Sequence, residues 1–134
     1  MEVPIHLQHQ PIIGVKNYDI IDGHFAPSSD AKALSIGQAQ YDENEISAKV
    51  FRHTGDNWSR QSEELPIHRV LDLAIFIVAS MQSGNNGEKL PVSNLKETVI
   101  APKLHQKLVT FYQKNQNFLN PRLVELRRLL NNLP

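Results

Sequence analysis

Cysteine is absent from the 134-residue sequence, and so are the short motifs of the commonest cofactor sites. Without cysteine there are no disulfides, thiol nucleophiles or thiolate metal ligands. The six glycines never form a G-x-G-x-x-G or Lys-terminated phosphate loop, and no G-x-S-x-G turn occurs. The six histidines show no H-E-x-x-H spacing, and His6 with His9 is a weak pair in an extended segment. The sequence therefore predicts no cofactor and no metal site.

Long apolar runs and an excess of charge of one sign are also missing. The apolar run 73–79 is much shorter than the ~20 residues that cross a bilayer. The N-terminal residues MEVPIHLQHQP lack the positive region and apolar core of a secretory signal. The formal net charge of zero provides no global attraction to nucleic acid or to an anionic membrane. We expect a cytoplasmic protein that binds no membrane and for which nucleic acid is a poor candidate partner.

Charge is nevertheless divided unevenly along the chain. Residues 1–95 contain 7 Lys+Arg and 12 Asp+Glu, a net charge of −5, whereas residues 96–134 contain 7 and 2, a net charge of +5. Two such halves attract each other, within one chain or between two chains. A dipole on a solvated surface is the plainer explanation, because net charge governs association and not fold.

The length suits a single domain over residues 1–134. Residues 1–16 are predicted to be an extended N-terminal arm whose segment 12–15 could pair as a short edge strand. Residues 83–92 are predicted to be a mobile loop, because they begin with the run SGNNG, which does not continue a helix cheaply.

Two segments with alternating apolar and polar residues predict a β-hairpin. Residues 31–41 and 46–53 both alternate, and the polar turn 42–45 joins them. On the second segment, Ile46, Ala48 and Val50 share one side. Residues 58–61 then form either a third strand or the approach to the next helix.

Residues 63–82, EELPIHRVLDLAIFIVASMQ, are predicted to form the helix around which the chain is arranged. Apolar residues recur with alternating three- and four-residue spacing, at Ile67, Val70, Leu71, Ala74, Ile77, Val78 and Met81. Leu73, Ile75 and Phe76 add apolar surface on the opposite side, so the helix needs cover on more than one face. Its start is predicted from Ser62 as the N-cap and Pro66 in the first turn.

Two amphipathic helices are predicted in the C-terminal third. One covers residues 102–116, and the other opens at Asn120 with Pro121 in its first position and runs to Asn132. The second helix carries Leu123, Leu126, Leu130 and Leu133 on one face. The predicted fold class is therefore α+β, with an antiparallel hairpin or three-stranded meander packed on the central apolar helix and two C-terminal amphipathic helices.

The run ISAKVFRHTGDNWSRQSEELPIHRVLDLA, with NYDIIDG and DAKALSIGQAQ upstream, resembles an uncharacterised family of small bacterial proteins of unknown function. The likeness covers roughly residues 17–78 and consists of many matching residue types rather than one motif. The resemblance implies a bacterial source and carries over no catalytic residue.

The polar segment around the predicted start of the central helix holds the best candidates for a functional site. Trp58, Arg60 and Arg69 are the predicted ligand-binding residues, because guanidinium groups near a helix N-terminus favour carboxylate or phosphate. Glu64 and His68 are the candidates for a general acid–base pair. The structural alternative is simpler. Glu64 and His68 are four residues apart on a predicted helix, and such pairs usually stabilise a surface by only ~0.2–0.5 kcal/mol.

These observations lead to two hypotheses of different classes. The first is a small cytoplasmic binding or interaction domain of unknown ligand that self-associates, because its central helix needs more apolar cover than a short chain supplies. A homo-oligomer is expected, with a protein partner or a small anionic ligand as further candidates. The alternative is an enzyme acting on a small anionic substrate through Arg60, Arg69, Glu64 and His68. Whether the protein is an enzyme stays open.

Overall fold

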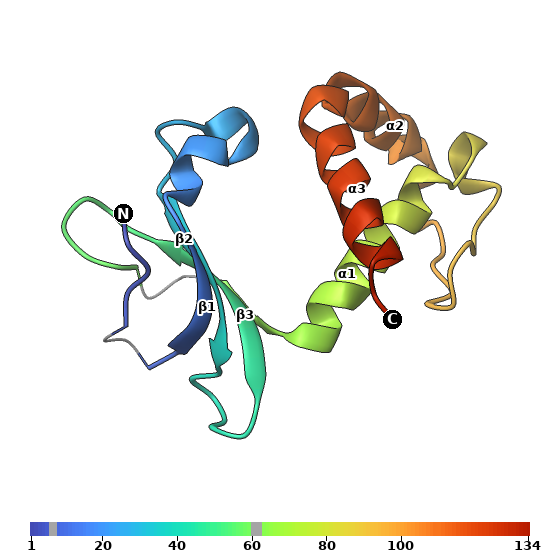
Figure 1. Cartoon of the computed structure of the whole chain (residues 1–134). Coiled ribbons are helices and arrows are strands. Elements are labelled where there is room, and N and C mark those ends of the chain that lie inside the picture. The colour runs from blue at the N-terminus through green and yellow to red at the C-terminus, as the bar shows by residue number, and fades with distance from the viewer. Residues whose placement is uncertain (6–7, 60–62) are drawn as a thin grey trace. The chain divides into compact units, whose positions relative to one another are not determined.

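The structure is a computed structural model that describes residues 1–5, 8–59 and 63–134. Strands dominate the first half of the chain and helices the second (Figure 1). The chain divides into two compact units, Met1–Leu71 and Asp72–Pro134, which we call the N-terminal and C-terminal units. The predicted α+β class is confirmed.

The N-terminal unit is built on a four-stranded antiparallel sheet in the order β1-β2-β3-β4 (Figure 1). Its strands are β1 Gln10–Lys16, β2 Ala31–Gln38, β3 Ile46–Arg52 and β4 Glu64–Pro66. Strands β2 and β3 form the hairpin that the alternating pattern predicts, and β1 is the predicted edge strand, with a register shift near Pro11.

The fourth strand corrects the predicted start of the central helix. Residues 64–66 pair with β3, with Glu64 opposite Lys49 and Pro66 opposite Ser47. Helix α1 therefore runs over Ile67–Met81 and does not include Glu64. The physical reason is Pro66, whose ring disfavours the α conformation of the residue before it and so keeps that residue extended. Residues 58–61 were predicted to form either a third strand or the approach to the helix. Trp58 makes a single bridge to His53, and residues 60 and 61 lie outside the described residues.

The more polar face of the sheet is buried, and the more apolar face is partly exposed. Ser35, Ser47, Lys49 and Phe51 lie on one face and are all buried. The other face carries apolar side chains such as Ile36, which is 41% exposed. A row of polar residues therefore points into the core of the N-terminal unit, while much of the apolar row remains open.

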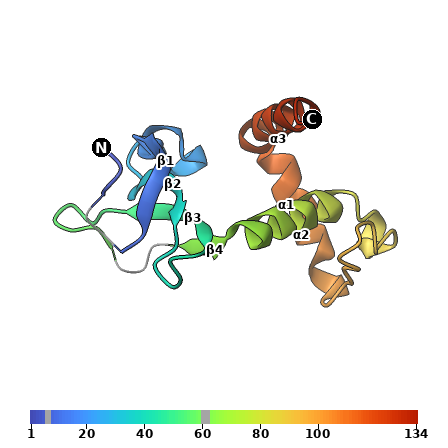
Figure 2. The same ribbon diagram turned by 60° about the horizontal axis from the view of Figure 1, so that its bottom comes forward.

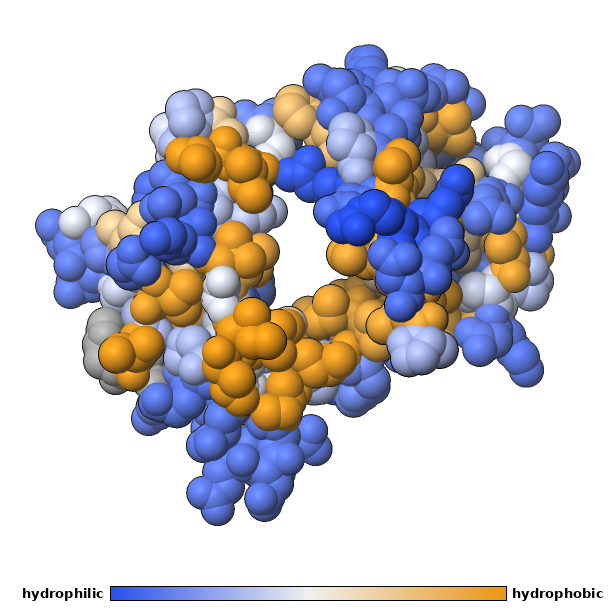
Figure 3. All heavy atoms as spheres, viewed as in Figure 1, coloured by the Kyte–Doolittle hydropathy of each residue, from blue (hydrophilic) through white to orange (hydrophobic). Residues whose placement is uncertain are grey.

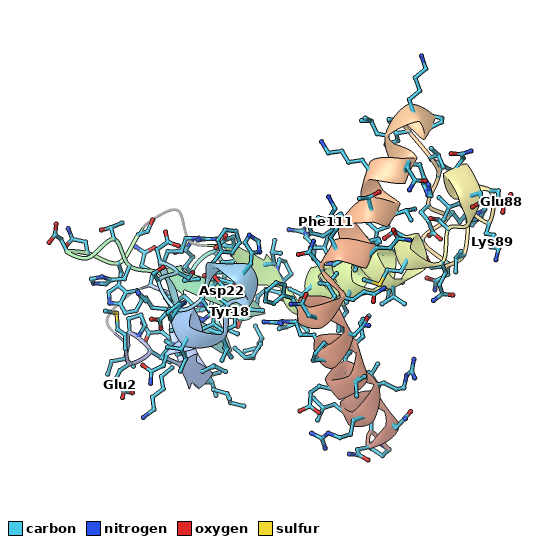
Figure 4. The ribbon with its side chains drawn as sticks, turned by 90° about the horizontal axis from the view of Figure 1, so that it is seen from above. Glu2, Tyr18, Asp22, Glu88, Lys89 and Phe111 are labelled. Carbon is cyan, nitrogen blue, oxygen red and sulfur yellow. The ribbon has the colours of Figure 1, made fainter. Side chains whose placement is uncertain are left out.

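Two short 3-10 helices, Tyr18–Ile21 and Gly23–Phe25, connect β1 to β2. Tyr18 and Asp22 project from this connection (Figure 4). Asp22 accepts a 2.6 Å hydrogen bond from the hydroxyl of Ser29, whose oxygen in turn accepts from the backbone N–H of Ala31. Side-chain hydrogen bonds therefore order the connection.

The C-terminal unit contains most of α1 and two further helices, which run in different directions (Figure 2). Helix α2 covers His105–Lys114 and is preceded by a 3-10 turn at Pro102–Leu104, close to the prediction. Helix α3 covers Gln116–Asn131, so it begins four residues before the predicted Asn120. Pro121 lies inside α3 and not at its first position, and Arg122 donates a side-chain hydrogen bond to the carbonyl of Phe118 there.

Hydrogen bonds between distant segments hold the C-terminal unit together. The hydroxyls of Ser80 on α1 and Tyr112 on α2 are 2.6 Å apart. Ser83 donates to the carbonyl of Ser80, so its oxygen accepts the 2.8 Å bond from Nε2 of His105. Glu97 accepts from the backbone N–H groups of 92 and 93 and from the Ser93 hydroxyl, and these bonds lower the pKa of Glu97 to about 2.

Helix α1 lacks the cover that its sequence demands. Only one of its residues, Ala79, is buried. Five of its large apolar side chains are between 42% and 57% exposed, namely Leu71, Leu73, Ile75, Phe76 and Ile77. Apolar side chains, drawn in orange, accordingly gather over the strands and along α1 in Figure 3. Neither unit by itself covers this apolar surface.

Candidate functional site

A buried polar cluster lies on the covered face of the sheet. It joins His9 to side chains of three strands: Ser35 on β2, Ser47 and Lys49 on β3, and Glu64 on β4. Nε2 of His9 is 2.9 Å from the Ser35 hydroxyl, and Nδ1 is 3.0 Å from the Ser47 hydroxyl. Oε1 of Glu64 lies 3.3 Å from His9 Nδ1 and 3.6 Å from Lys49 Nζ. These contacts fix His9, which directly precedes β1, against the sheet.

The surroundings of His9 determine its protonation. A carboxylate only accepts hydrogen bonds, so the neutral tautomer that fits places the proton on Nδ1, facing Glu64 and Ser47. Nε2 then accepts from Ser35. Burial lowers the pKa of His9, the Glu64 carboxylate opposes this, and the Lys49 ammonium adds to it. The imidazole is therefore held neutral in the folded protein.

The order Ser35–His9–Glu64 resembles the arrangement by which a base and its orienting carboxylate activate a hydroxyl. The Ser35 hydroxyl is not accessible to a substrate in this structure, which argues against nucleophilic catalysis, because Ser35 is 4% exposed and His9 is 0% exposed. A substrate carbonyl does not reach the Ser35 oxygen without movement of the covering segments. The cluster is accordingly a buried polar core held by the two hydrogen bonds between His9 and the serines. Among the described residues, Oε1 of Glu64 has no hydrogen-bond partner and is balanced only by the nearby charge of Lys49.

The residues predicted from sequence as a site are distributed over different environments. Glu64 is buried beside Lys49 and is not on the helix, so the helical i,i+4 relation to His68 does not exist. His68 and Arg69 are exposed in the first turn of α1. Trp58 is half-buried and packs its ring edge-on to Phe51, with centroids 5.7 Å apart.

Arg60 lies outside the described residues, and so does Ser62, the predicted N-cap. The predicted binding role of Arg60, Trp58 and Arg69 stays a prediction. Of these residues, Arg69 acts on the hydroxyl of Tyr41: burial and the carboxylates of Glu45 and Glu64 raise the pKa of Tyr41, and Arg69 opposes the rise.

A second ionic cluster lies at the end of β3. The Arg52 guanidinium donates two hydrogen bonds to Glu63 through Nε and Nη2, and a third, of 2.6 Å, to Asp30 through Nη1. These bonds raise the pKa of Arg52 and lower that of Glu63. Since its guanidinium is engaged with two carboxylates, Arg52 serves the structure first and is a poor anchor for an anionic ligand.

The open face of the sheet forms a shallow apolar concavity of about 380 Å³, which we call the apolar sheet groove. Side chains from all four strands and the first turn of α1 contribute to it. Its apolar members are Ile13, Val15, Leu34, Ile36, Ala48, Val50, Leu65 and Val70. The alternation of β2 and β3 was predicted from the sequence, but the alternation alone does not say which side of the sheet faces the core.

A second exposed apolar surface lies on the last two turns of α3 and just beyond them. Four leucines, at positions 126, 129, 130 and 133, fall on one side of the helix. We call Leu126, Leu129, Leu130 and Leu133 the leucine face, and their exposure ranges from 39% to 67%. The predicted stripe on this helix is therefore present, and the C-terminal unit by itself leaves its C-terminal part exposed.

Among residues 1–5, 8–59 and 63–134, no three His, Cys, Asp or Glu side chains are grouped so that they could hold a metal ion. No helix in that part of the chain is both long and apolar enough to cross a membrane.

A family model described as a family of unknown function, DUF6530, matches residues 1–93 of this chain. The chain therefore belongs to that family, which confirms the resemblance to an uncharacterised family. The matched region includes the sheet, the buried polar cluster and α1, whereas α2 and α3 lie outside it. Comparison with curated proteins and with solved structures gives no match.

Proposed function

We propose that this protein is a small interaction domain that self-associates through exposed apolar helix faces. The observation that carries the proposal is the leucine face of α3, with four leucines at least 39% exposed in the single chain. Contiguous apolar patches on monomeric proteins rarely exceed a few hundred Å², and larger ones mark interaction sites. The exposed side chains of α1 add to the same argument.

The proposal places the protein in a bacterial cytoplasm as a homo-oligomer. A chain without cysteine has no disulfide to join its copies, so apolar burial and charge must hold them. The alternative, an enzyme for a small anionic substrate, stays a prediction. The buried position of Glu64 and the engagement of Arg52 with two carboxylates give it no support.

Light scattering of the eluted protein across a wide concentration range tests the proposal. We expect a mass of at least twice 15.2 kDa. Leu130→Glu should shift the protein toward a single-chain mass, with dissociation strengthened on the order of 10-fold or more, because the new carboxylate would be buried in the interface. Val124→Glu is the matched control, since Val124 is 66% exposed on the opposite side of α3.

A single-chain mass at every concentration would refute self-association. Equal behaviour of Leu130→Glu and Val124→Glu would show that the leucine face takes no part in it.

A further inference from the structure

Building on the proposed self-association, we infer that the leucine face of α3 in one copy seats in the apolar sheet groove of a second copy. The exchange is reciprocal, so that each copy gives its α3 and receives its partner's. The proposal names an occupant for the apolar face of the sheet, which the N-terminal unit by itself leaves partly exposed.

The first argument is the reversed burial of the sheet. An antiparallel sheet in a globular protein packs its apolar face and exposes its polar face. Here Ser35 and Ser47 are buried, while Ile13 is 69% and Val15 is 43% exposed on the groove side. A sheet that buries its polar face and exposes its apolar face is expected to cover the apolar face with another element or molecule. Helices are the usual cover for such a face.

The second argument is size. The leucine face spans residues 126–133, which at 1.5 Å per residue is about 10 Å of helix. Four strands with spacings of about 4.8 Å make the groove about 14 Å wide. The stripe therefore fits within the groove, and α2 offers less, because only Leu104 and Phe111 are exposed among its large apolar side chains and those of the turn before it.

The third argument is charge. The hairpin turn at one end of the groove carries Asp42, Glu43 and Glu45 and no basic residue. At its other end, Arg52 is already paired with two carboxylates. Helix α3 has three arginines against one glutamate, a net charge of +2. Helix α1 carries one arginine and one aspartate, a net charge of zero, so the attraction selects α3.

Closure of the assembly follows from reciprocity. A contact between two different surfaces produces an open chain of copies unless it closes. Mutual exchange of one helix between two copies has two-fold symmetry and forms a closed dimer. Both apolar sheet grooves and both leucine faces are occupied in such a dimer. No further copy can therefore bind through these surfaces.

A complementation experiment tests this arrangement. Ile13→Lys places a cation in the groove, and Leu130→Glu places an anion on the leucine face. We expect a single-chain mass for each variant alone and a species of twice that mass when the two are mixed in equal amounts. The mixed dimer retains one intact contact, between the normal groove of one variant and the normal helix of the other. Native mass spectrometry should show one copy of each variant in that species.

Matched controls keep the result interpretable. Ile20→Lys alters a side chain that is 60% exposed in the same unit but lies outside the groove, and Val124→Glu alters the far side of α3. Both should keep the mass of the unaltered protein. Ile13→Ser replaces Ile13→Lys if the fluorescence of Trp58, the only tryptophan, shows that the lysine variant is unfolded.

The outcomes separate this inference from the function on which it rests. A dimeric Ile13→Lys beside a monomeric Leu130→Glu would overturn the groove contact, because the leucine faces would then pair with each other, and self-association would stand. Two monomeric variants that do not combine would overturn the reciprocal exchange. A monomeric unaltered protein would refute both.

Discussion

The two faces of the four-stranded sheet contrast in what covers them. One face carries two alanines, two serines, a lysine and a phenylalanine and is buried, whereas the other carries larger aliphatic side chains and is partly exposed. The covered face is stable because its polar atoms bond to one another, as Ser35 and Ser47 do to the two ring nitrogens of His9. Burial within one chain therefore follows hydrogen-bond complementarity here, and exposed apolar surface indicates where another molecule binds.

The largest effect is expected from Phe51, which among the described residues is the one large apolar side chain that is fully buried on the covered face. Its ring contacts His9 and Trp58 edge-on and has Lys49 Nζ 5.0 Å from its centre. Phe51→Ala should lower the free energy of unfolding by about 3–5 kcal/mol, because it removes apolar burial and leaves a cavity. Urea unfolding followed by Trp58 fluorescence measures the change.

Phe25→Ala is the matched control for that prediction. Phe25 is 61% exposed on the connection between β1 and β2, so its loss should change the same free energy far less. Equal costs for the two variants would mean that the covered face is not the core of this unit.

The second effect is a pH dependence that comes from His9. Its pKa is lowered in the folded state from the ordinary 6.5, so the unfolded chain binds more protons below that pH. The free energy of unfolding should therefore be fully retained above pH 6.5 and fall as the pH drops below it, by at most ~1.4 kcal/mol per pH unit. Stability measured between pH 7.5 and 5.5 tests the sign.

His9→Asn should remove this slope, although it also weakens the cluster. His68→Asn, which changes an exposed histidine of α1, should leave the slope in place. A slope that survives His9→Asn would have to come from groups outside the buried cluster.

The smallest effect is expected on the open face. In the Leu130→Glu background, where we expect no dimer, Ile13→Ser should change the free energy of unfolding by no more than about 0.5 kcal/mol, since Ile13 is 69% exposed. In the unaltered background the same substitution should weaken the dimer. A large loss of stability in the Leu130→Glu background would show that the chain itself covers the groove.

Local patterns were sufficient to predict much of the fold. The alternation in residues 31–41 and 46–53 predicts β2 and β3, because side chains of a strand point alternately to opposite faces. The spacing of leucines near the C-terminus predicts the amphipathic α3 in the same way. The start of α1 was wrong because helix-start signals at Ser62 and Glu63 were preferred over the extended pairing before Pro66.

The candidate site was harder to predict, because it depends on contacts between distant residues. His9 meets Ser35 and Ser47 across 26 and 38 residues, and no local spacing contains that information. The sequence indicated the buried cluster only by placing Ser47, Lys49 and Phe51 on one side of a strand. That pattern does not say which side of the strand is buried.

The sequence by itself determined the periodicities, and with them the class of elements and which residues share a face. Only the tertiary structure decided which face of the sheet is covered. The reason is that apolar burial is non-directional and can be satisfied by any partner, whereas the bonds of His9 to two serines require three segments to meet at fixed distances. The covered polar face is thus a property of the folded chain, and the open apolar face is the surface we assign to a second copy.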